Sequence, residues 1–418
     1  MSYSQILRNR AFRNLWLGQT ISQLGDSFFY VAFMFMVQKV TGSYTMVGFV
    51  GVCETAPYLL FSLYGGVVAD RLNRRAIMLW SDMLSGIILC LLAALVYGLG
   101  KPPVWALLVT PFLLSSVRSF FMPAKSAAIP ALVSSEELMN ANALSSMAQN
   151  IVPILSLSLS AAVLSQIYDK SPALFLIYAV LMNSLSFFGS ALFVYKLPPI
   201  LPDRNPDVQP HPWIDLKDGL RYIRNRRVLV VLLSVQTGLS LAISPFFVVY
   251  VAANTEWLGG KPQTLAWCEL VFFVGMVVSS FYVGTLNLNK PGKGFIYGCA
   301  AVGLAVLAMA FSPYFALFLL WNLVAGLAVP FANIPVAAWM QSTVPDAFRG
   351  RVNSLYQMLQ AGVQPIGLGF GGFLVAHAGI SMAFIVMGGG MAFAALTGLL
   401  DREFRSLEMP THPSKSEV

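Results

Sequence analysis

The stretch "GGVVADRLNRR", residues 65–75, places one carboxylate and three arginines between two strongly apolar segments. The twenty residues before it, 45–64, carry Glu54 as their single charge. The segment that follows is again apolar and about as long. Short charged connections between segments that can each cross a bilayer are typical of a polytopic membrane protein.

Composition excludes a soluble globular protein. Of the 418 residues, 57% are hydrophobic and 11% are charged, whereas soluble domains carry about 25% charged residues. Mean hydropathy is +0.70. The apolar runs are continuous rather than alternating, which favours helices over a closed barrel. We predict an all-α membrane protein with twelve transmembrane helices. The predicted spans cover residues 12–38, 45–69, 77–98, 103–124, 138–165, 173–196, 228–252, 264–287, 294–312, 314–340, 353–376 and 380–400.

Basic residues predict the orientation of these spans. With the N-terminus inside, the cytoplasmic segments hold 21 Lys and Arg residues, and Arg118 lies within a span. The outer loops hold four, namely Lys39, Lys101, Lys170 and Lys261. By the positive-inside rule we expect both termini and the charged connection to be cytoplasmic. Topology thus accounts for the net charge of +8, and no nucleic-acid partner is expected. The four cysteines lie in predicted spans without a CxxC pair, so we expect no metal site and no cofactor.

An internal repeat indicates two halves. "VSSEELMNANALSSMAQNIV" (133–152) matches "VPDAFRGRVNSLYQMLQAGV" (344–363) at an offset of 211, and aligns Gln149 with Gln360. A second match, at a similar offset, aligns the first predicted span with the seventh. We therefore predict two pseudo-symmetric six-helix bundles about an axis along the membrane normal. The predicted parts are an N-terminal bundle (1–196), a cytoplasmic linker with an amphipathic helix (197–227), a C-terminal bundle (228–401) and a cytoplasmic tail (402–418).

The loop motif carries a family resemblance. Two six-helix halves, a polar central loop and "GVVADRLNRR" (66–75) between the second and third spans resemble the major facilitator superfamily. "NRAFRNLWLGQTISQLGDSFF" (9–29) and "PAKSAAIPALVSSEELMNANAL" (123–144) are similar to its bacterial macrolide-efflux and enterobactin-exporter branch. "PAK" is also similar to bacterial lysophospholipid transporters. The resemblance covers essentially the whole chain.

In that family the loop aspartate contacts the start of a helix in the C-terminal half, and the arginines make ion pairs that anchor the loop. The resemblance implies gating roles for Gly66, Asp70, Arg71, Arg74 and Arg75. Asp70 would meet unpaired N–H groups near Asn353 and Ser354, where a helix N-terminus favours a carboxylate. Alternatively, the arginines only set topology. Asn73 replaces the family's glycine, and we expect it to keep a left-handed turn.

Charged residues at depth in the membrane are costly and usually functional. Asp26 and Glu54 both fall near the predicted midplane. Asp26 shares one helical face with Gln23 and Tyr30, and this face is predicted to line a polar cavity. Either carboxyl could carry a proton in exchange for a substrate. Alternatively, Asp26 pairs with a basic residue of a neighbouring helix or satisfies polar neighbours.

Two further charges come at similar depth in the third and fourth spans. Asp82 and Arg118 are candidates for a structural ion pair, while the family resemblance assigns a functional role to an arginine in the fourth helix, here Arg118. Glu269 lies near the start of the eighth span, where we expect its side chain to reach the interface.

The second half offers amides in place of charges. Gln236 and Gln360 belong to polar stripes on the seventh and eleventh spans, and Gln149 is expected to face Gln360 across the axis. Such stripes either line a cavity or hydrogen-bond between helices. The stretch "QNIVPILSLSLS" (149–160) lacks the glycines of the signature found in many exporters, which weakens the case for export by proton exchange.

We expect a secondary transporter, not an enzyme, that exports an amphipathic drug, macrolide or siderophore by alternating access coupled to proton entry. The alternative is a lysophospholipid transporter or an importer of the same fold. A membrane enzyme or receptor is a third class, but the sequence offers no reactive pair at depth. The expected partners are a small-molecule substrate, protons and the lipid bilayer. The expected location is the bacterial inner membrane, as a monomer.

Overall fold

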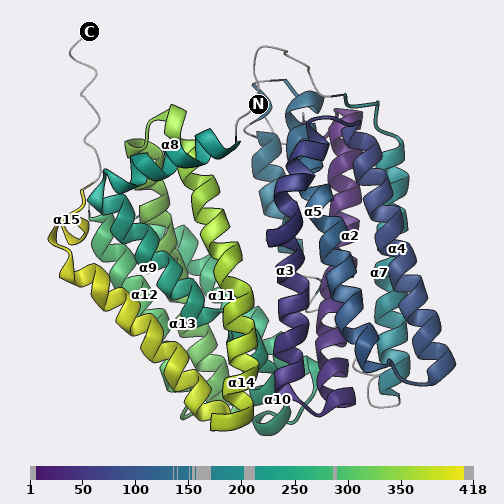
Figure 1. Cartoon of the computed structure of the whole chain (residues 1–418). Coiled ribbons are helices and arrows are strands. Elements are labelled where there is room, and N and C mark those ends of the chain that lie inside the picture. Colours follow the sequence, from purple (N-terminus) through teal and green to yellow (C-terminus); the bar gives the residue numbers. More distant parts are fainter. Residues whose placement is uncertain are drawn as a thin grey trace. The chain divides into compact units, whose positions relative to one another are not determined.

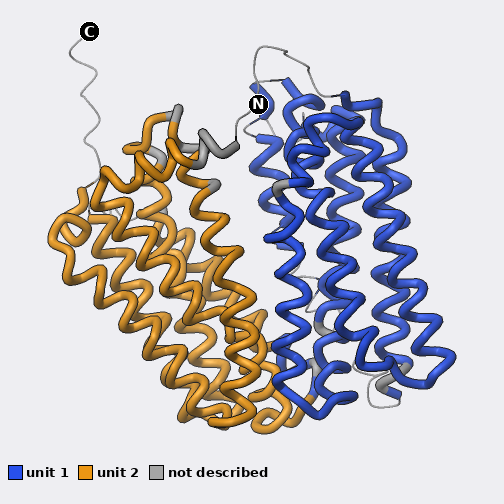
Figure 2. The backbone as a smooth tube through the Cα atoms, viewed as in Figure 1, with its two compact units in different colours: residues 1–206, 261–266 blue, residues 207–260, 267–418 orange. Residues whose placement is uncertain are grey.

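The computed structural model describes residues 6–134, 136–138, 140–149, 151–152, 156, 171–201, 212–285 and 290–408. All the elements in this part of the chain are helices (Figure 1). Two compact units divide the chain (Figure 2). Unit 1 comprises Met1–Pro206 and Lys261–Ala266, and unit 2 comprises Asp207–Gly260 and Trp267–Val418. The main division falls within the proline-rich linker.

Ten helices in the described residues are long and apolar enough to cross a membrane. One of them, Arg351–Leu400, has 50 residues and would measure about 75 Å as a straight helix, more than twice the hydrocarbon core. Gly379 interrupts it with φ 83° and ψ 170°, a conformation that glycine adopts readily. The interruption falls between the predicted spans 353–376 and 380–400. The predicted span 138–165 lies mostly outside the described residues, and the total of twelve stays a prediction.

Five long helices make up the described part of unit 1: α2 (Arg10–Thr41), α3 (Tyr44–Ala69), α4 (Arg74–Leu99), α5 (Val104–Leu132) and α7 (Pro172–Tyr195). Short polar residues and glycine set their ends. The Asn9 side chain accepts hydrogen bonds from the N–H groups of Ala11 and Phe12 at the start of α2. Gly42 ends α2 at φ 61°, and Ser43 caps α3. These are the residues that helix termini favour.

Small residues let the helices of unit 1 approach closely. Helix α2 packs on α7, α3 packs on α5, and α4 packs on both α5 and α7. A Cβ added at Gly25 would overlap Ser186 Oγ, and one at Gly65 would overlap the carbonyl of Ser119. Close backbone approach of this kind stabilises helix pairs in lipid.

Helix α5 is longer than predicted. The sequence prediction ends this span at residue 124, but α5 continues to Leu132 through Pro123 and Pro130. Proline in a membrane helix removes one hydrogen bond without ending the helix. Lys125, counted above among the cytoplasmic residues, therefore lies within α5.

The described part of unit 2 contains eight helices: α8 (Pro212–Arg224), α9 (Arg227–Ile243), α10 (Phe246–Trp257), α11 (Pro262–Thr285, its first turn assigned to unit 1), α12 (Pro291–Met309), α13 (Phe315–Thr343), α14 (Asp346–Leu400) and α15 (Arg402–Arg405). Ser244 and Pro245 separate α9 from α10 within one candidate span. A proline at this point removes a donor from the helical ladder.

Glycines also mark the contacts within unit 2. Helix α12 packs on α13 and α14, and α14 packs on α9. A Cβ at Gly298 would lie 2.6 Å from the backbone nitrogen of Ala332, and one at Gly326 would overlap the carbonyl of Phe272. The two units therefore use the same kind of helix packing.

Two short helices cover the ends of longer ones in unit 2. On α8, Asp218 lies 3.7 Å from Arg351, and Tyr222 stacks on Phe348 with ring centroids 4.4 Å apart. Helix α8 thus packs on the first turns of α14. Asp401, which caps α15, accepts a hydrogen bond of 2.7 Å from Arg227 Nε. The N–H of Phe404 and the Arg227 guanidinium lower the pKa of Asp401.

Candidate functional site

Asp26 lies where α2 crosses α7. Its carboxylate accepts a hydrogen bond of 3.2 Å from the side-chain amide of Asn183, at the close contact made by Gly25. Gln19 on the same face is 8% exposed, and Gln23 Oε1 is buried without a hydrogen-bond partner. Tyr30, one helical turn beyond Asp26, is partly buried. The predicted polar face is therefore in the interior of unit 1, with Asn183 as a partner that sequence reasoning missed.

Arg118 is the positive charge that acts on both Asp26 and Glu54. Glu54 is partly buried on α3, and Arg118 is exposed on α5, the helix that packs on α3. Asp26 and Glu54 also act on each other. Among the described residues, no ion pair within 4.0 Å joins Arg118 to either carboxylate. The three predicted residues thus lie within electrostatic range of one another in unit 1, as a cluster without an ion pair among its members in the described residues.

Asp82 and Arg118, the candidate structural ion pair, do not lie within 4.0 Å of each other as an ion pair in the described part of the chain. Asp82 is 2% exposed and accepts a hydrogen bond of 2.7 Å from the hydroxyl of Ser190 on α7. Equal depth suggested the pair, but Asp82 lies on the face of α4 that packs on α7. A hydroxyl therefore satisfies this carboxylate where an arginine was expected.

Lys125 is a charged residue that sequence reasoning misplaced. It is 5% exposed in α5, and in the part of the chain that the structure describes it makes neither a hydrogen bond nor an ion pair. Lys125 follows Arg118 by two helical turns, so the two cations share one face of α5, and they act on each other electrostatically. Continuing the helix through Pro123 would have placed Lys125 in the span.

The charged loop begins where α3 ends. Asp70 is exposed, and its N–H donates to the Gly66 carbonyl at 3.0 Å. Asn73 does not take the expected left-handed turn, because its φ is −60° and its ψ is 112°. Its side chain instead caps α4, accepting hydrogen bonds of 3.1 Å from the N–H groups of Arg75 and Ile200.

Two of the three arginines hold this loop to unit 1. Arg74 donates to the carbonyl of Ala127 at 3.0 Å and to that of Ala69 at 3.3 Å. Arg75 donates to the carbonyl of Tyr195 at 2.6 Å and lies over its ring. Arg71 is exposed. The anchors are backbone carbonyls, where the family resemblance implied ion pairs.

The amides of unit 2 make a direct contact between two helices. Ser240 on α9 donates a hydrogen bond to Gln360 Oε1 on α14. The Gln360 amide nitrogen is buried without a partner, and Gln236 is partly buried on α9. Gln149 is an exposed residue of unit 1. The expectation that Gln149 faces Gln360 across the axis stays a prediction.

The sequence did not predict one buried polar pair in unit 2. The hydroxyl of Tyr250 on α10 donates to Asn322 on α13 at 2.9 Å, and each residue is 1% exposed. Cys268 and Glu269 on α11 act electrostatically on Tyr250. Glu269 is partly buried in the second turn of α11, deeper than expected. Both members of the pair stand in apolar runs, where no pattern sets them apart.

The whole chain matches a known family. Residues 2–415 match the major facilitator family described as transmembrane secretion effectors. The chain belongs to this family. Its relatives include macrolide efflux protein A of Streptococcus pyogenes, which is 24% identical over 95% of this chain and 97% of that protein. The enterobactin exporter EntS of Escherichia coli is 24% identical over 85% of this chain and 83% of that protein.

A solved structure shows the same fold. The bacterial homologue of the iron transporter ferroportin, in an inward-facing state, superposes with a TM-score of 0.72 at 16% identity. The match covers 96% of this chain and 100% of that one. The protein is therefore a multi-pass membrane transporter of the major facilitator superfamily, and the resemblance inferred from the loop and the repeat is confirmed.

Proposed function

We propose that this transporter exports an amphipathic small molecule, such as a drug, macrolide or siderophore, by alternating access driven by proton entry. The observation that carries the proposal is the unpaired cluster of Asp26, Glu54 and Arg118 within unit 1. Charged groups in a membrane interior usually mark substrate or proton pathways. The relatives, which include a macrolide efflux protein and an enterobactin exporter, support cargo of this kind.

The cluster can exchange a proton for a cargo. An ionised Asp26 or Glu54 attracts the exposed Arg118 side chain, and a proton on either carboxyl removes that attraction. The Asn183 amide donates to Asp26 in both states, so the carboxyl stays in place while its charge changes. A proton and a cationic cargo then compete for the same ionised carboxyls. Such competition is what the exchange of a proton for cargo requires.

The charged loop supplies the proposed gate. Asp70 is exposed, and its side chain makes no hydrogen bond or ion pair within the described residues, whereas Arg74 and Arg75 fix the loop to unit 1. We propose that Asp70 binds the N-terminal end of α14 when the transporter opens outward. The sequence placed this end near Asn353 and Ser354, but α14 begins at Asp346, so these two residues lie two turns inside the helix and the unpaired N–H groups belong to its first turn. A carboxylate at a helix N-terminus gains typically about 0.3–1 kcal/mol at an exposed site, enough to bias two states yet weak enough to break in each cycle.

The remaining topology is also proposed. We place the transporter in the bacterial inner membrane as a monomer, with twelve spans in two six-helix bundles and cytoplasmic termini. The bias of Lys and Arg toward one set of loops and the interruption of α14 at Gly379 support this arrangement. Labelling single cysteines introduced at residues 9 and 402 from each side of the membrane tests the orientation.

Transport by inverted membrane vesicles under an imposed proton gradient tests the function. Macrolides, dyes, siderophores and lysophospholipids are offered to the wild type and to Asp26→Asn and Glu54→Gln. We expect gradient-driven uptake of an amphipathic compound that falls sharply in both variants, while the matched control Glu256→Gln, at the exposed end of α10, keeps it. Uptake that ignores both the gradient and the variants would contradict proton exchange, and uptake of lysophospholipid alone would replace the cargo.

A further inference from the structure

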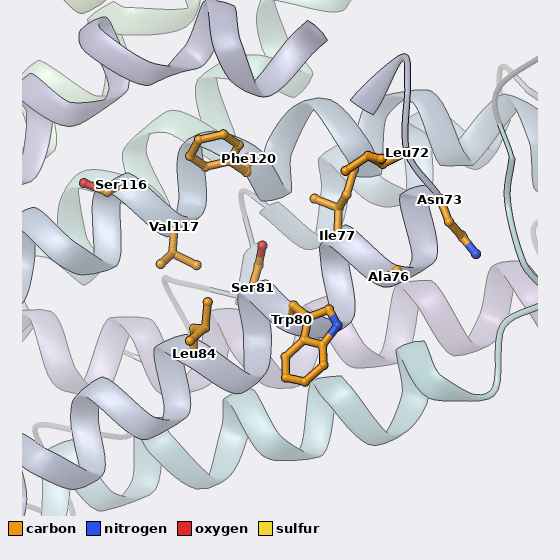
Figure 3. Close-up of a pocket in the computed structure, with 10 residues that line it drawn as sticks. All are labelled: Leu72, Asn73, Ala76, Ile77, Trp80, Ser81, Leu84, Ser116, Val117 and Phe120. Carbon is orange, nitrogen blue, oxygen red and sulfur yellow. The ribbon is translucent and has the colours of Figure 1, made fainter. Parts of the chain in front are cut away.

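A groove of about 400 Å³ lies between α4 and α5, next to the charged loop (Figure 3). Its volume is within the range of ligand pockets, about 300–1,000 Å³. Large apolar side chains from both helices form its walls. Those used below are Leu72, Trp80, Leu84 and Phe120.

The groove belongs to a surface that faces hydrocarbon. Trp80 is 65% exposed and Leu84 is 46% exposed, and Ile87 and Leu91 continue the same apolar stripe along α4. Helices α4 and α5 are both candidate membrane spans, so a stripe of this kind meets lipid. An acyl chain is therefore the molecule that this groove encounters at high concentration.

The end of the groove carries an excess of positive charge. Leu72 and Asn73 line that end, and the exposed Arg71 precedes them. Asp70 is the one carboxylate of this turn, against Arg71, Arg74 and Arg75. Arg74 and Arg75 bind neutral carbonyls, and no ion pair within 4.0 Å involves any of the three arginines in the described part of the chain. An anionic headgroup complements this charge.

Three polar side chains line the groove, Asn73, Ser81 and Ser116, and two of them, Asn73 and Ser116, have hydrogen-bond partners. Asn73 Oδ1 accepts two backbone N–H groups, and the Ser116 hydroxyl donates to the Phe112 carbonyl at 2.7 Å. A polar cargo would find few groups to bind, whereas an alkyl chain needs none. The lining therefore favours a lipid over a transported compound.

We propose that this groove binds one anionic phospholipid of the cytoplasmic leaflet, with an acyl chain between Trp80 and Phe120 and the headgroup at Arg71. The lipid is a bound ligand of the transporter, distinct from its cargo. This inference is independent of the proposed export and of proton coupling.

Native mass spectrometry of the purified full-length transporter tests the site. The protein is equilibrated with phosphatidylglycerol or with phosphatidylcholine of the same acyl chains. We expect wild type to retain one phosphatidylglycerol more tightly than phosphatidylcholine, by about fivefold for a single arginine at a headgroup. Arg71→Gln should bring the two lipids to equal retention. Ala76→Phe, which fills the groove, should lose both.

Matched variants in unit 2 keep the test specific. Arg402→Gln removes an exposed basic residue, and Ala316→Phe enlarges an exposed position on α13; both should retain lipid as wild type does. Where Ala76→Phe lowers thermal stability, Trp80→Ala removes one wall of the groove and should shorten lipid retention without filling it. Asp26→Asn should bind lipid normally even though transport is lost, which separates this site from the proposed function.

Three results would overturn the assignment. The first is a wild type that holds both lipids equally, with no effect of Arg71→Gln. The second is unchanged retention in both Ala76→Phe and Trp80→Ala. The third is displacement of the lipid one-for-one by a transported macrolide, which would assign the groove to the cargo.

Discussion

The two units differ in the polar groups that their membrane helices carry. Within the described spans, unit 1 holds ionisable side chains at depth, namely Asp26, Glu54, Asp82, Arg118 and Lys125, whereas unit 2 holds Glu269 and otherwise hydroxyls and amides. At the offset that aligns Phe28 with Phe246, Asp26 aligns with Ser244. Two units built on the same packing therefore differ in the charge of their spans, which is why we propose that proton coupling is located in unit 1.

Arg118→Ala should give the largest effect, because it removes the cation that acts on both carboxylates. We expect gradient-driven transport to fall about a hundredfold, equivalent to about 2.7 kcal/mol. Arg118→Lys should restore part of the rate, since it keeps the charge but loses the planar guanidinium. Initial rates in vesicles measure both. In unit 2, Gln360→Ala should retain most of the rate, and a larger loss there than in Arg118→Ala would reverse the comparison.

Packing should behave alike in the two units. Gly25→Leu and Gly326→Leu each force a side chain into a neighbouring helix, and overpacking of this kind costs about 1–3 kcal/mol. We expect both variants to melt at lower temperature in detergent by similar amounts. Gly389→Leu, at an exposed position with no atom near its added Cβ, is the control. Destabilisation confined to one unit would show that the packing is not shared.

Substitutions of the loop arginines should show that an arginine that anchors the loop contributes more to stability than an exposed one. Arg74→Gln loses two hydrogen bonds to carbonyls of α3 and α5, and we expect it to reduce stability by about 1–2 kcal/mol. Arg71→Gln removes an exposed side chain and should stay within about 0.5 kcal/mol of wild type. Thermal unfolding followed by circular dichroism measures the difference. Equal melting temperatures for the two variants would contradict the anchoring role of Arg74.

The smallest effect is expected for the hydroxyl of unit 2. Ser240→Ala removes one hydrogen bond to Gln360, and such bonds between membrane helices average about 0.6 kcal/mol. We expect a small fall in melting temperature and transport close to wild type. A loss of proton coupling in this variant would move part of the coupling site into unit 2.

Hydropathy predicted most helices because length and continuous apolarity decide them. The described helices α2, α3, α4 and α7 begin and end within about three residues of their predicted spans, in line with the usual uncertainty of helix ends. The predicted end of α5 at residue 124 was too early, since the helix continues through Pro123 and Pro130 and proline is tolerated in membrane helices. Lys125 was misplaced because it follows directly after that predicted end.

The sequence shows how far along a helix a charged residue lies, but it does not show which neighbouring helix the side chain faces. Asp26, Glu54 and Arg118 were found because each is a charge inside an apolar run. The Ser190 partner of Asp82 was not foreseen, since depth alone does not tell which neighbouring helix a side chain faces. Tyr250 and Asn322 were missed because their pairing depends on which helices pack together.

Proton movement by purified transporter in liposomes tests the division between the units most directly. A pH-sensitive dye records proton flux when a transported compound is added to wild type, Asp26→Asn, Glu54→Gln and Gln360→Ala. We predict that flux is lost in the two carboxylate variants of unit 1 and retained in Gln360→Ala. Flux retained in both carboxylate variants, or lost in Gln360→Ala alone, would contradict the location of coupling in unit 1.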